Sequence, residues 1–405
     1  MKKIGLVILG IGVLIGSIYL LAKQDNSKIL IEEEVKQENT SLVFMLQDEE
    51  GNYNKSEELP SSGYSLNTSK SICSNNTIPT WEDDKLYLNN LSKNETSCYL
   101  YFDVFSLAKD TILSNSKVNE GEPDFSQVAT TDEGIYKAED DWGESYYFRG
   151  AVENNYVKFA GYYWRIIRIN GDGSIRLIYN GKNTEITPPG TQLDISDFNS
   201  NYDRSEYVGY MYTEEEQHGN TTNSDIKTVV DEWYNKYLIN YADYISKEAG
   251  FCGDREMADG SLWSSIESSH NYVAYERLVD NKTPILKCSN SSDLYTVNDS
   301  SKGNKGLNNP IGLITADEVV MAGGVYGQTN TKYYLYIGQE YWTMSPYDFD
   351  SDGWNDMFIV NLDGKVTSDW SEAPYGVRPV INLASDVTLS GTGTASDPYI
   401  VEGAE

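Results

Sequence analysis

The chain begins with a long apolar run that gives way to a polar segment. Two lysines precede the uncharged stretch 4–22, and Lys23 closes it. As a helix with a rise of about 1.5 Å per residue, the stretch would be about 28 Å long, which just crosses the hydrocarbon core of a bilayer. A cleaved signal peptide is the alternative, but bulky residues at 19–21 stand where such a peptide has small ones. The pattern favours a membrane anchor over 1–23, with the rest of the chain outside the cell.

The next segments predict a stalk and a small β domain. Residues 24–39 are polar and acidic and lack aromatic side chains, which is typical of a solvated stalk. The stretches 41–46 and 98–102 are rich in β-branched and aromatic residues, so we expect strands there. A small β domain over 40–104 follows from them. The polar, broken stretch 105–133 is interpreted as a linker.

A β-sheet core opens the large domain, which we place at 134–405. The runs 163–169 and 174–179 alternate apolar and basic positions, and Asn-Gly-Asp-Gly separates them at 170–173. Two such runs around a turn of this kind predict a β-hairpin.

Helices interrupt the strands of the large domain at two places. Ser224 or Asp225 can begin a helix that continues through about Leu238 with one apolar face. A second helix begins near Thr315, because Thr315 and Glu318 have the spacing of a capping box. The chain then returns to strands, the first of them expected at 333–337. Helices set among strands and long loops predict an α+β fold class.

Three motifs near the C-terminus resemble a known family. The segments 341–346, 360–366 and 376–383 resemble the closing pattern of C-type-lectin-like domains of the sulfatase-modifying-factor type. The segments 148–179 and 312–321 resemble large uncharacterised surface proteins of Gram-positive bacteria. The resemblance covers roughly residues 134–402 and implies a C-type-lectin-like large domain there. The membrane helix and a small β-sandwich-like domain precede it in the predicted architecture. The resemblance implies a fold rather than an activity.

Composition and charge narrow the class of partner. Hydrophobic residues make up 39% and charged residues 23% of the 405 residues, with 32 Tyr and 8 Trp, which is typical of a folded chain. Lys and Arg total 31 against 62 Asp and Glu, a net charge of −31. Phosphate backbones would be repelled by such a surface, so nucleic acid is not an expected partner.

Four cysteines suggest two structural bridges. They stand at 73, 98, 252 and 288, and their order favours the local pairs Cys73 with Cys98 and Cys252 with Cys288 among three pairings. None lies in a CxxC motif, which argues against zinc and against thioredoxin-like chemistry. Disulfides of this kind are typical of an oxidising compartment.

An acidic loop offers a candidate cation site. Asp348, Asp350, Asp352 and Asp356 occupy positions 1, 3, 5 and 9 of a calcium loop, with glycine at position 6. Ile359 stands where the bidentate glutamate of an EF-hand belongs, and no helices flank the loop, which excludes an EF-hand. A calcium-binding turn and a solvated acidic hairpin loop remain as alternatives.

No catalytic residue is predicted. His218 and His270 stand in polar loop sequence, and the common hydrolase, metalloprotease and nucleotide motifs are missing from the sequence. A carboxylate pair for glycoside hydrolysis would be recognised by its separation in space, which sequence does not show.

The pattern as a whole predicts a binding or adhesion protein, anchored in the membrane and displayed at the cell surface. Trp354, Trp370 and Tyr375 lie in the loops 348–356 and 370–375 and are the candidate ligand-binding residues, with a glycan or a protein as ligand. Two alternatives stay open. One is an extracellular enzyme that acts on or modifies glycans, and the other is a structural protein of the envelope or of an appendage.

Overall fold

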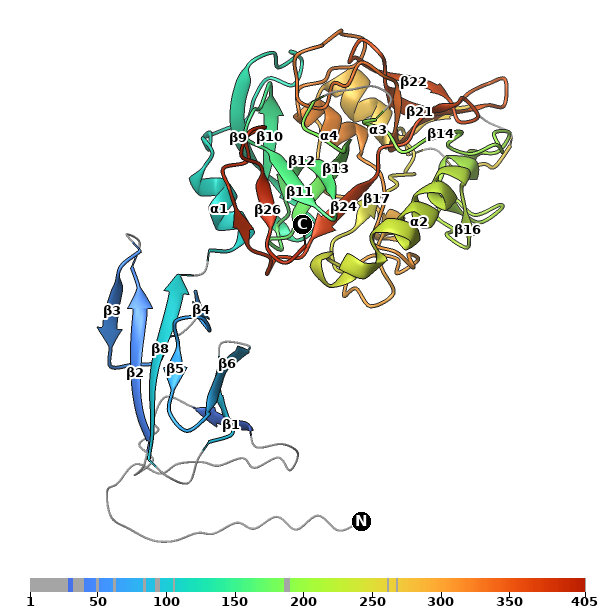
Figure 1. The fold of residues 1–405 in the computed structure, drawn as a ribbon. Coiled ribbons are helices and arrows are strands. Elements are labelled where there is room, and N and C mark those ends of the chain that lie inside the picture. The colour runs from blue at the N-terminus through green and yellow to red at the C-terminus, as the bar shows by residue number, and fades with distance from the viewer. Residues whose placement is uncertain are drawn as a thin grey trace, which may run out of the picture. The chain divides into compact units, whose positions relative to one another are not determined.

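A computed structural model gives the structure of the chain, which divides into two compact units, Met1–Ser106 and Leu107–Glu405 (Figure 1). The residues that the structure describes are 28–31, 40–48, 51–60, 63–82, 85–91, 95–104, 106–185, 190–260, 262–266 and 269–404. Strands account for 37% and helices for 14% of the structure, so the fold is mostly β.

The predicted α+β class with a membrane helix is therefore corrected to a mostly β fold, whereas the small β-sandwich-like domain and the large C-type-lectin-like domain stay predictions. Both predicted helices exist, but they are short. The helix α2 (Asp225–Tyr237) has 13 residues, and α4 (Ala316–Met321) has 6. Strands and turns take up most of the chain around them. Strong capping signals predict where a helix begins but not how much of the chain is helical, which is why the sequence overstated the helical part of the fold.

The prediction of a single-pass membrane protein with its bulk outside the cell is also corrected. A membrane-spanning helix needs about 20 mostly apolar residues, and no helix within the described ranges has that length and apolar character. The predicted anchor at 1–23 lies outside the described residues, as do 24–27 and 32–39 of the predicted stalk. The stalk residues between them form β1 (Lys28–Ile31).

Two sheets make up the part of the smaller unit that the structure describes. One has the order β3-β2-β8-β4 with β5 also paired to β8, and the other has the order β1-β7-β6. Their strands are β2 (Thr40–Gln47), β3 (Tyr53–Ser56), β4 (Tyr64–Leu66), β5 (Ile72–Cys73), β6 (Ile78–Glu82), β7 (Lys85–Asn89) and β8 (Thr96–Val104). Buried and exposed positions alternate along β8, as expected for a strand with one face on a core. Leu100 and Phe102 lie in that core with Leu86 and Leu88. The strands predicted at 41–46 and 98–102 are confirmed.

An eight-stranded sheet forms the centre of the larger unit (Figure 1). Its order is β24-β13-β12-β11-β26-β25, with β10 paired to β12 and β9 paired to β10. Its strands are β9 (Asp132–Asp140), β10 (Gly143–Gly150), β11 (Tyr156–Phe159), β12 (Tyr162–Ile169), β13 (Ile175–Gly181), β24 (Val380–Leu383), β25 (Leu389–Ser390) and β26 (Tyr399–Val401). The pair β12 and β13 is the predicted hairpin. Every residue of β13 is buried, the polar Arg176 and Asn180 included.

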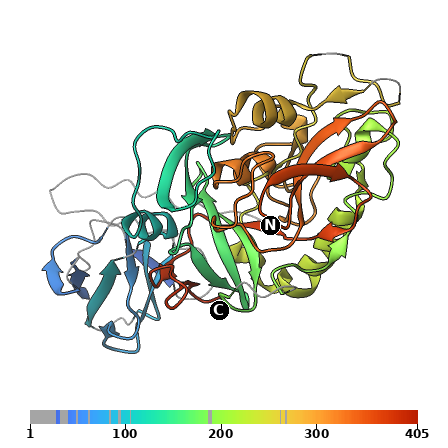
Figure 2. The same cartoon turned by 90° about the horizontal axis from the view of Figure 1, so that it is seen from above.

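A second sheet of six strands carries the acidic loop. Its order is β14-β23-β20-β21-β22, with β18 paired to β20. Its strands are β14 (Ile195–Ser196), β18 (His270–Asn271), β20 (Tyr341–Phe349), β21 (Asn355–Val360), β22 (Val366–Trp370) and β23 (Tyr375–Gly376). Figure 2 shows the orange and red strands of this sheet separated from the green strands of the first.

Both predicted helix starts are confirmed. Ser224 caps α2, because its side chain accepts a hydrogen bond from the backbone N–H of Lys227. Thr315 and Glu318 form the predicted capping box of α4. The other elements of this unit are α1 (Ala108–Ser114), η1 (Ser205–Val208), β15 (Met211–Tyr212), β16 (Thr222–Asn223), η2 (Ile239–Tyr244), β17 (Phe251–Cys252), α3 (Val273–Tyr275), η3 (Glu276–Asn281), η4 (Ser291–Asp293) and β19 (Leu294–Tyr295). The stretch predicted as a linker contains α1, whose Ala108 and Ile112 lie in the core of the larger unit.

A buried ion-pair network joins α4 to the central sheet. The Glu318 carboxylate lies 2.9 Å from Nε of Arg168 and 2.5 Å from Nε of Arg176. Arg168 also pairs with Asp140 at 2.5 Å. All four side chains are almost fully buried, so each charge is compensated where water cannot reach it.

One predicted strand is wrong. The run 333–337 forms turns and pairs with no strand in the described part of the chain. Arg378 is fully buried and donates hydrogen bonds to the carbonyls of Leu335 at 3.0 Å and Tyr179 at 3.1 Å. Buried backbone carbonyls need hydrogen-bond donors. Here the Arg378 guanidinium supplies them in place of the N–H groups of a neighbouring strand.

Candidate functional site

The acidic loop joins β20 to β21, and residues from four strands form one row across the sheet beside it. Asn271 of β18 lies opposite Asp348, Asp348 opposite Asp356, and Asp356 opposite Trp370 of β22. Directly opposed residues of antiparallel strands point to the same face of a sheet. These four residues are named the cross-strand row below. The adjacent row, which includes His270, Phe349 and Asn355, is buried.

Three aromatic rings pack together at one end of the row. Trp354 stacks on Tyr202 with 4.4 Å between ring centroids and an interplanar angle of 20°. Trp370 packs against Trp354 at 5.0 Å and 40°. Tyr202, Trp354 and Trp370 are named the aromatic stack. Trp370 is 50% exposed, so it presents open aromatic surface, while Trp354 is held between its two neighbours.

Asp350 holds the loop in shape. Its Oδ1 accepts hydrogen bonds from the backbone N–H groups of Asp352 at 2.8 Å and Trp354 at 3.1 Å. Its own N–H donates to the Trp354 carbonyl at 2.9 Å. Gly353 has a φ of 85°, a conformation that costs glycine little. The Asp350 carboxylate therefore stabilises the turn by hydrogen bonds to its backbone, as aspartate often does.

Burial and neighbouring charge make two carboxyls of the row unusually basic. Burial, together with the charges of Asp356 and Asp350, raises the pKa of Asp348 to about 7. Burial, together with Asp350 and Asp369, raises the pKa of Asp356 to about 6. Oδ1 of Asp348 and Oδ1 of Asp356 are buried and have no hydrogen-bond partner in the part of the chain that the structure describes. Two carboxyls so close together resist simultaneous ionisation near neutral pH.

The arrangement combines the two kinds of group that bind sugars. An open indole face packs against the C–H groups of a pyranose ring, and carboxyl and amide groups bond to its hydroxyls. The row supplies both on one face of the sheet. Because the stack and the strands fix these side chains, little ordering is needed on binding.

The structure brings together some of the predicted site residues and not others. Trp354 and Trp370 are in contact, and Tyr375 is not part of the stack. The Tyr375 hydroxyl donates to Asp369, and its ring packs edge-on against Trp342 with 5.1 Å between centroids. Asp369 precedes Trp370 on β22 and therefore faces the other side of the sheet.

Sequence reasoning did not find Tyr202 and Asn271. Both come from segments far from the acidic loop, and neither has a local motif. Asn355 links the Tyr202 segment to the loop, because its backbone N–H donates to the Tyr202 carbonyl at 3.1 Å. Only the pairing of distant segments could have shown this.

The four aspartates do not form a ready-made cation site. Asp348 and Asp356 lie side by side, Asp350 serves the turn, and Asp352 is exposed. Among the described residues, three metal-binding side chains have ligand atoms within 4.8 Å of one another only at Cys252, Asp254 and Cys288. Calcium at the acidic loop stays a prediction.

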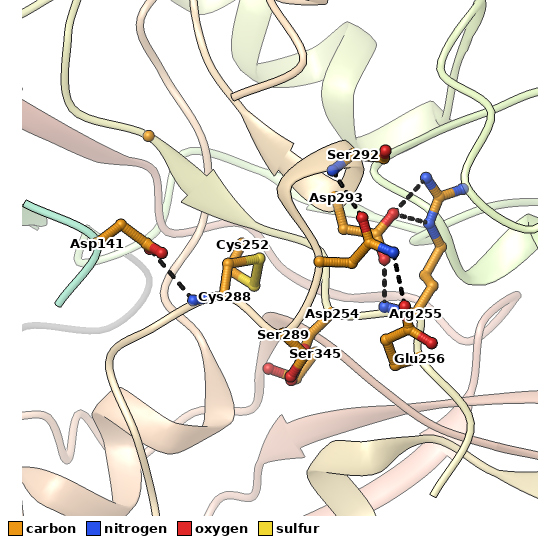
Figure 3. The surroundings of a disulfide bond; sticks show 12 residues. Asp141, Cys252, Asp254, Arg255, Glu256, Cys288, Ser289, Ser292, Asp293 and Ser345 are labelled. Atoms are coloured by element: carbon orange, nitrogen blue, oxygen red, sulfur yellow. Dashed lines mark hydrogen bonds and ion pairs between the residues drawn. A yellow bond between two sulfur atoms is a disulfide. The ribbon is translucent and has the colours of Figure 1, made fainter. Parts of the chain in front are cut away.

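Both predicted disulfides are confirmed. Cys73 pairs with Cys98 with 4.1 Å between Cα atoms, and Cys252 pairs with Cys288 with 5.4 Å between Cα atoms. Figure 3 shows the second bridge, with Asp141 accepting a hydrogen bond from the Cys288 backbone N–H at 3.1 Å. With all four sulfurs bonded, no thiol is free for catalysis in this state.

A separate groove of about 550 Å³ lies along β9. Phe125, Tyr147 and Met321 contribute apolar surface to it, and Lys137 and Lys282 are among its charged lining residues. It is built from other elements than the cross-strand row.

Comparison with known protein families, curated proteins and solved structures finds no match for this chain. The resemblance to C-type-lectin-like domains of bacterial surface proteins therefore stays a prediction, and the geometry of the site alone supports a function.

Proposed function

We propose that this protein binds glycans through the cross-strand row and the aromatic stack. The observation that carries the proposal is the position of the half-exposed Trp370 ring beside the Asp348 and Asp356 carboxyls on one face of a sheet. An aromatic plane with convergent polar groups is what recognition of a sugar requires.

Each part of the row has its own task in this proposal. One face of a sugar ring stacks on Trp370, and its hydroxyls bond to the two carboxyls. Asp348 and Asp356 are both partly exposed, so a ligand on this face can reach their carboxyls, which accept hydrogen bonds from sugar hydroxyls. Asn271 is exposed at the far end of the row and adds an amide that both donates and accepts.

The aromatic stack keeps Trp370 in place before the ligand arrives. Tyr202 covers one side of Trp354, and Trp354 supports Trp370. A preorganised ring loses little side-chain entropy on binding, so more of the contact energy appears as affinity.

A glycan array with the full chain and two variants tests the proposal. Trp370→Ala removes the open ring, and we expect it to weaken binding of the retained glycans by about tenfold or more, about 1.4 kcal/mol. Leu362→Ala is the matched control, because Leu362 is 58% exposed in the turn between β21 and β22. Binding that survives Trp370→Ala unchanged, or no retained glycan at all, contradicts the proposal.

The carboxyl pair favours a second function, which is cleavage of the bound glycan. Asp348 and Asp356 lie directly opposite each other on adjacent strands, and retaining glycosidases use two carboxyls held about 5–5.5 Å apart. Asp348 and Asp356 have raised pKa values of about 7 and about 6, so one can hold a proton while the other is ionised.

Product analysis distinguishes the two functions. Glycans retained on the array are incubated with wild type, Asp348→Asn and Asp356→Asn. Shorter products that form with wild type and disappear with either variant identify an enzyme. Intact glycans in all three incubations identify a binding protein.

A further inference from the structure

The Cys252–Cys288 bridge has a third metal-binding side chain next to it. The two sulfurs and a carboxylate oxygen of Asp254 all lie within 4.8 Å of one another. The bridge links β17 to the segment that follows η3. The cluster thus consists of Cys252 and Asp254 from one chain segment and Cys288 from another (Figure 3).

Asp254 is buried, and one of its oxygens is unused. The residue is 3% exposed, and its Oδ2 pairs with Arg277. Oδ1 has no hydrogen-bond partner within the described ranges. A buried carboxylate oxygen normally has one, so this atom has the capacity to bind a cation.

The backbone around Asp254 is held in place from the other side. Asp293 accepts hydrogen bonds from the Arg255 backbone N–H at 2.6 Å and from Arg255 Nε at 2.9 Å. The Gly253 N–H donates to the Asp293 carbonyl at 2.8 Å. Figure 3 shows Asp293 and Arg255 beside the bridge. These contacts do not involve the sulfurs, so they hold the backbone on both sides of Asp254 independently of the bridge.

We propose that reduction of the Cys252–Cys288 disulfide turns this cluster into a zinc site. Cys252 and Cys288 supply two thiolates and Asp254 supplies one oxygen. Thiolate ligands favour zinc over calcium and magnesium, and three protein ligands leave a fourth position for water.

The chemistry balances with a dithiol as reductant. The dithiol gives two electrons and two protons and becomes a disulfide, and the S–S bond of the bridge becomes two thiols. Zinc binding then releases both thiol protons. With zinc–sulfur distances of about 2.3 Å, the two sulfurs come to lie about 3.8 Å apart, a small separation for two segments that Asp293 and Asp141 hold on either side.

A small cavity lies beside Cys252 and is large enough for one water molecule. It has a volume of about 20 Å³, and Asp141, Cys252 and Thr315 are among its lining residues. A cavity of about 10–15 Å³ already holds one water molecule. Zinc would keep β17 and the Cys288 segment joined when the covalent bridge is lost.

Metal analysis of the full chain tests the proposal. The protein is reduced with a water-soluble phosphine, which becomes the phosphine oxide, and is then dialysed against Zn²⁺. We expect one zinc per reduced chain beyond the content of the oxidised chain. Replacing zinc with Co²⁺ should give the charge-transfer absorption of cobalt bound to thiolate.

Three variants identify the ligands. Cys252→Ser with Cys288→Ser should abolish zinc uptake, whereas Cys73→Ser with Cys98→Ser should retain it. Asp254→Asn should weaken zinc binding by about tenfold or more, and the near-ultraviolet circular dichroism of its oxidised form shows whether the fold is kept. Absence of zinc in the reduced wild type, or equal uptake by Cys252→Ser with Cys288→Ser, overturns the proposal.

Discussion

Asp348 and Asp356 lie directly opposite each other on β20 and β21, and burial raises the pKa of both carboxyls. The folded protein therefore binds protons at this pair that the unfolded chain has already released. Stability falls with rising pH wherever the folded state binds more protons. The pair thus opposes folding increasingly between about pH 4, the ordinary value for aspartate, and pH 7, the raised pKa of Asp348.

The first prediction concerns this pH dependence. Asp348→Asn removes one charge without changing the shape of the side chain, so we expect it to raise the melting temperature at pH 8 by a few degrees, on the order of 1 kcal/mol. At pH 4 the gain should vanish, because the wild-type carboxyl is then protonated. Thermal unfolding followed by circular dichroism at both pH values measures it. Asp352→Asn, at an exposed position of the same loop, is the control, and an equal gain in both variants would contradict the prediction.

The second prediction separates the two tryptophans of the aromatic stack. Trp354→Ala removes two ring contacts at once and should destabilise the larger unit by about 1–3 kcal/mol, since each aromatic pair contributes about 0.5–1.5 kcal/mol. Trp370→Ala removes one contact and a half-exposed ring, so its cost to stability should be smaller. Urea unfolding of both variants measures the difference. Equal stabilities would show that Trp354 does not support the site.

The third prediction concerns the buried ion-pair network. Burial alone would raise the pKa of Glu318, but the charges of Arg176 and Arg168 hold it below its ordinary value. Glu318→Gln leaves two buried guanidinium groups without their shared carboxylate, and we expect a loss of about 3–5 kcal/mol. Thr315→Ala removes only the cap and should cost about 1 kcal/mol. Chemical denaturation measures the free energy of unfolding of both variants. A Glu318→Gln variant no less stable than Thr315→Ala would contradict the prediction.

The fourth prediction uses the division of the chain into two units. Each disulfide closes a loop of similar length, with sequence separations of 25 and 36 residues, so loss of either should cost about 3–4 kcal/mol. Cys73→Ala with Cys98→Ala should lower the unfolding transition of the smaller unit alone. Cys252→Ala with Cys288→Ala should lower that of the larger unit alone. Differential scanning calorimetry resolves the transitions, and a shift of both by either variant would show that the units unfold together.

Features that depend on neighbouring residues could be predicted from the sequence. The capping box of Thr315 and Glu318 lies within one helical turn, and the hairpin over 163–179 depends on a local turn. The pairing of the cysteines follows their order in the chain. In each case the residues that decide the structure are close enough in sequence to be recognised as one pattern.

Features that depend on contacts between distant residues could not be predicted from the sequence. The run 333–337 has the composition of a strand but lies in turns, because the Arg378 guanidinium satisfies the Leu335 carbonyl in place of a neighbouring strand. The second carboxylate partner of Arg168, Asp140, is likewise remote from Glu318 in sequence. The fold class could not be predicted for the same reason, since local signals show where helices start and not how the remaining chain pairs into sheets.

The contact of Tyr202 with Trp354 means that the aromatic stack can form only after two distant segments of the chain have come together. Tyr202 is delivered by a segment that precedes the acidic hairpin by well over a hundred residues, and the two are joined through Asn355. An isolated hairpin would contain both tryptophans but lack the Tyr202 ring that packs against Trp354. The same holds for a chain in which the Tyr202 segment has not yet docked. The proposed glycan binding at this face therefore depends on the completed unit, and we do not expect it of a short peptide that contains the hairpin alone.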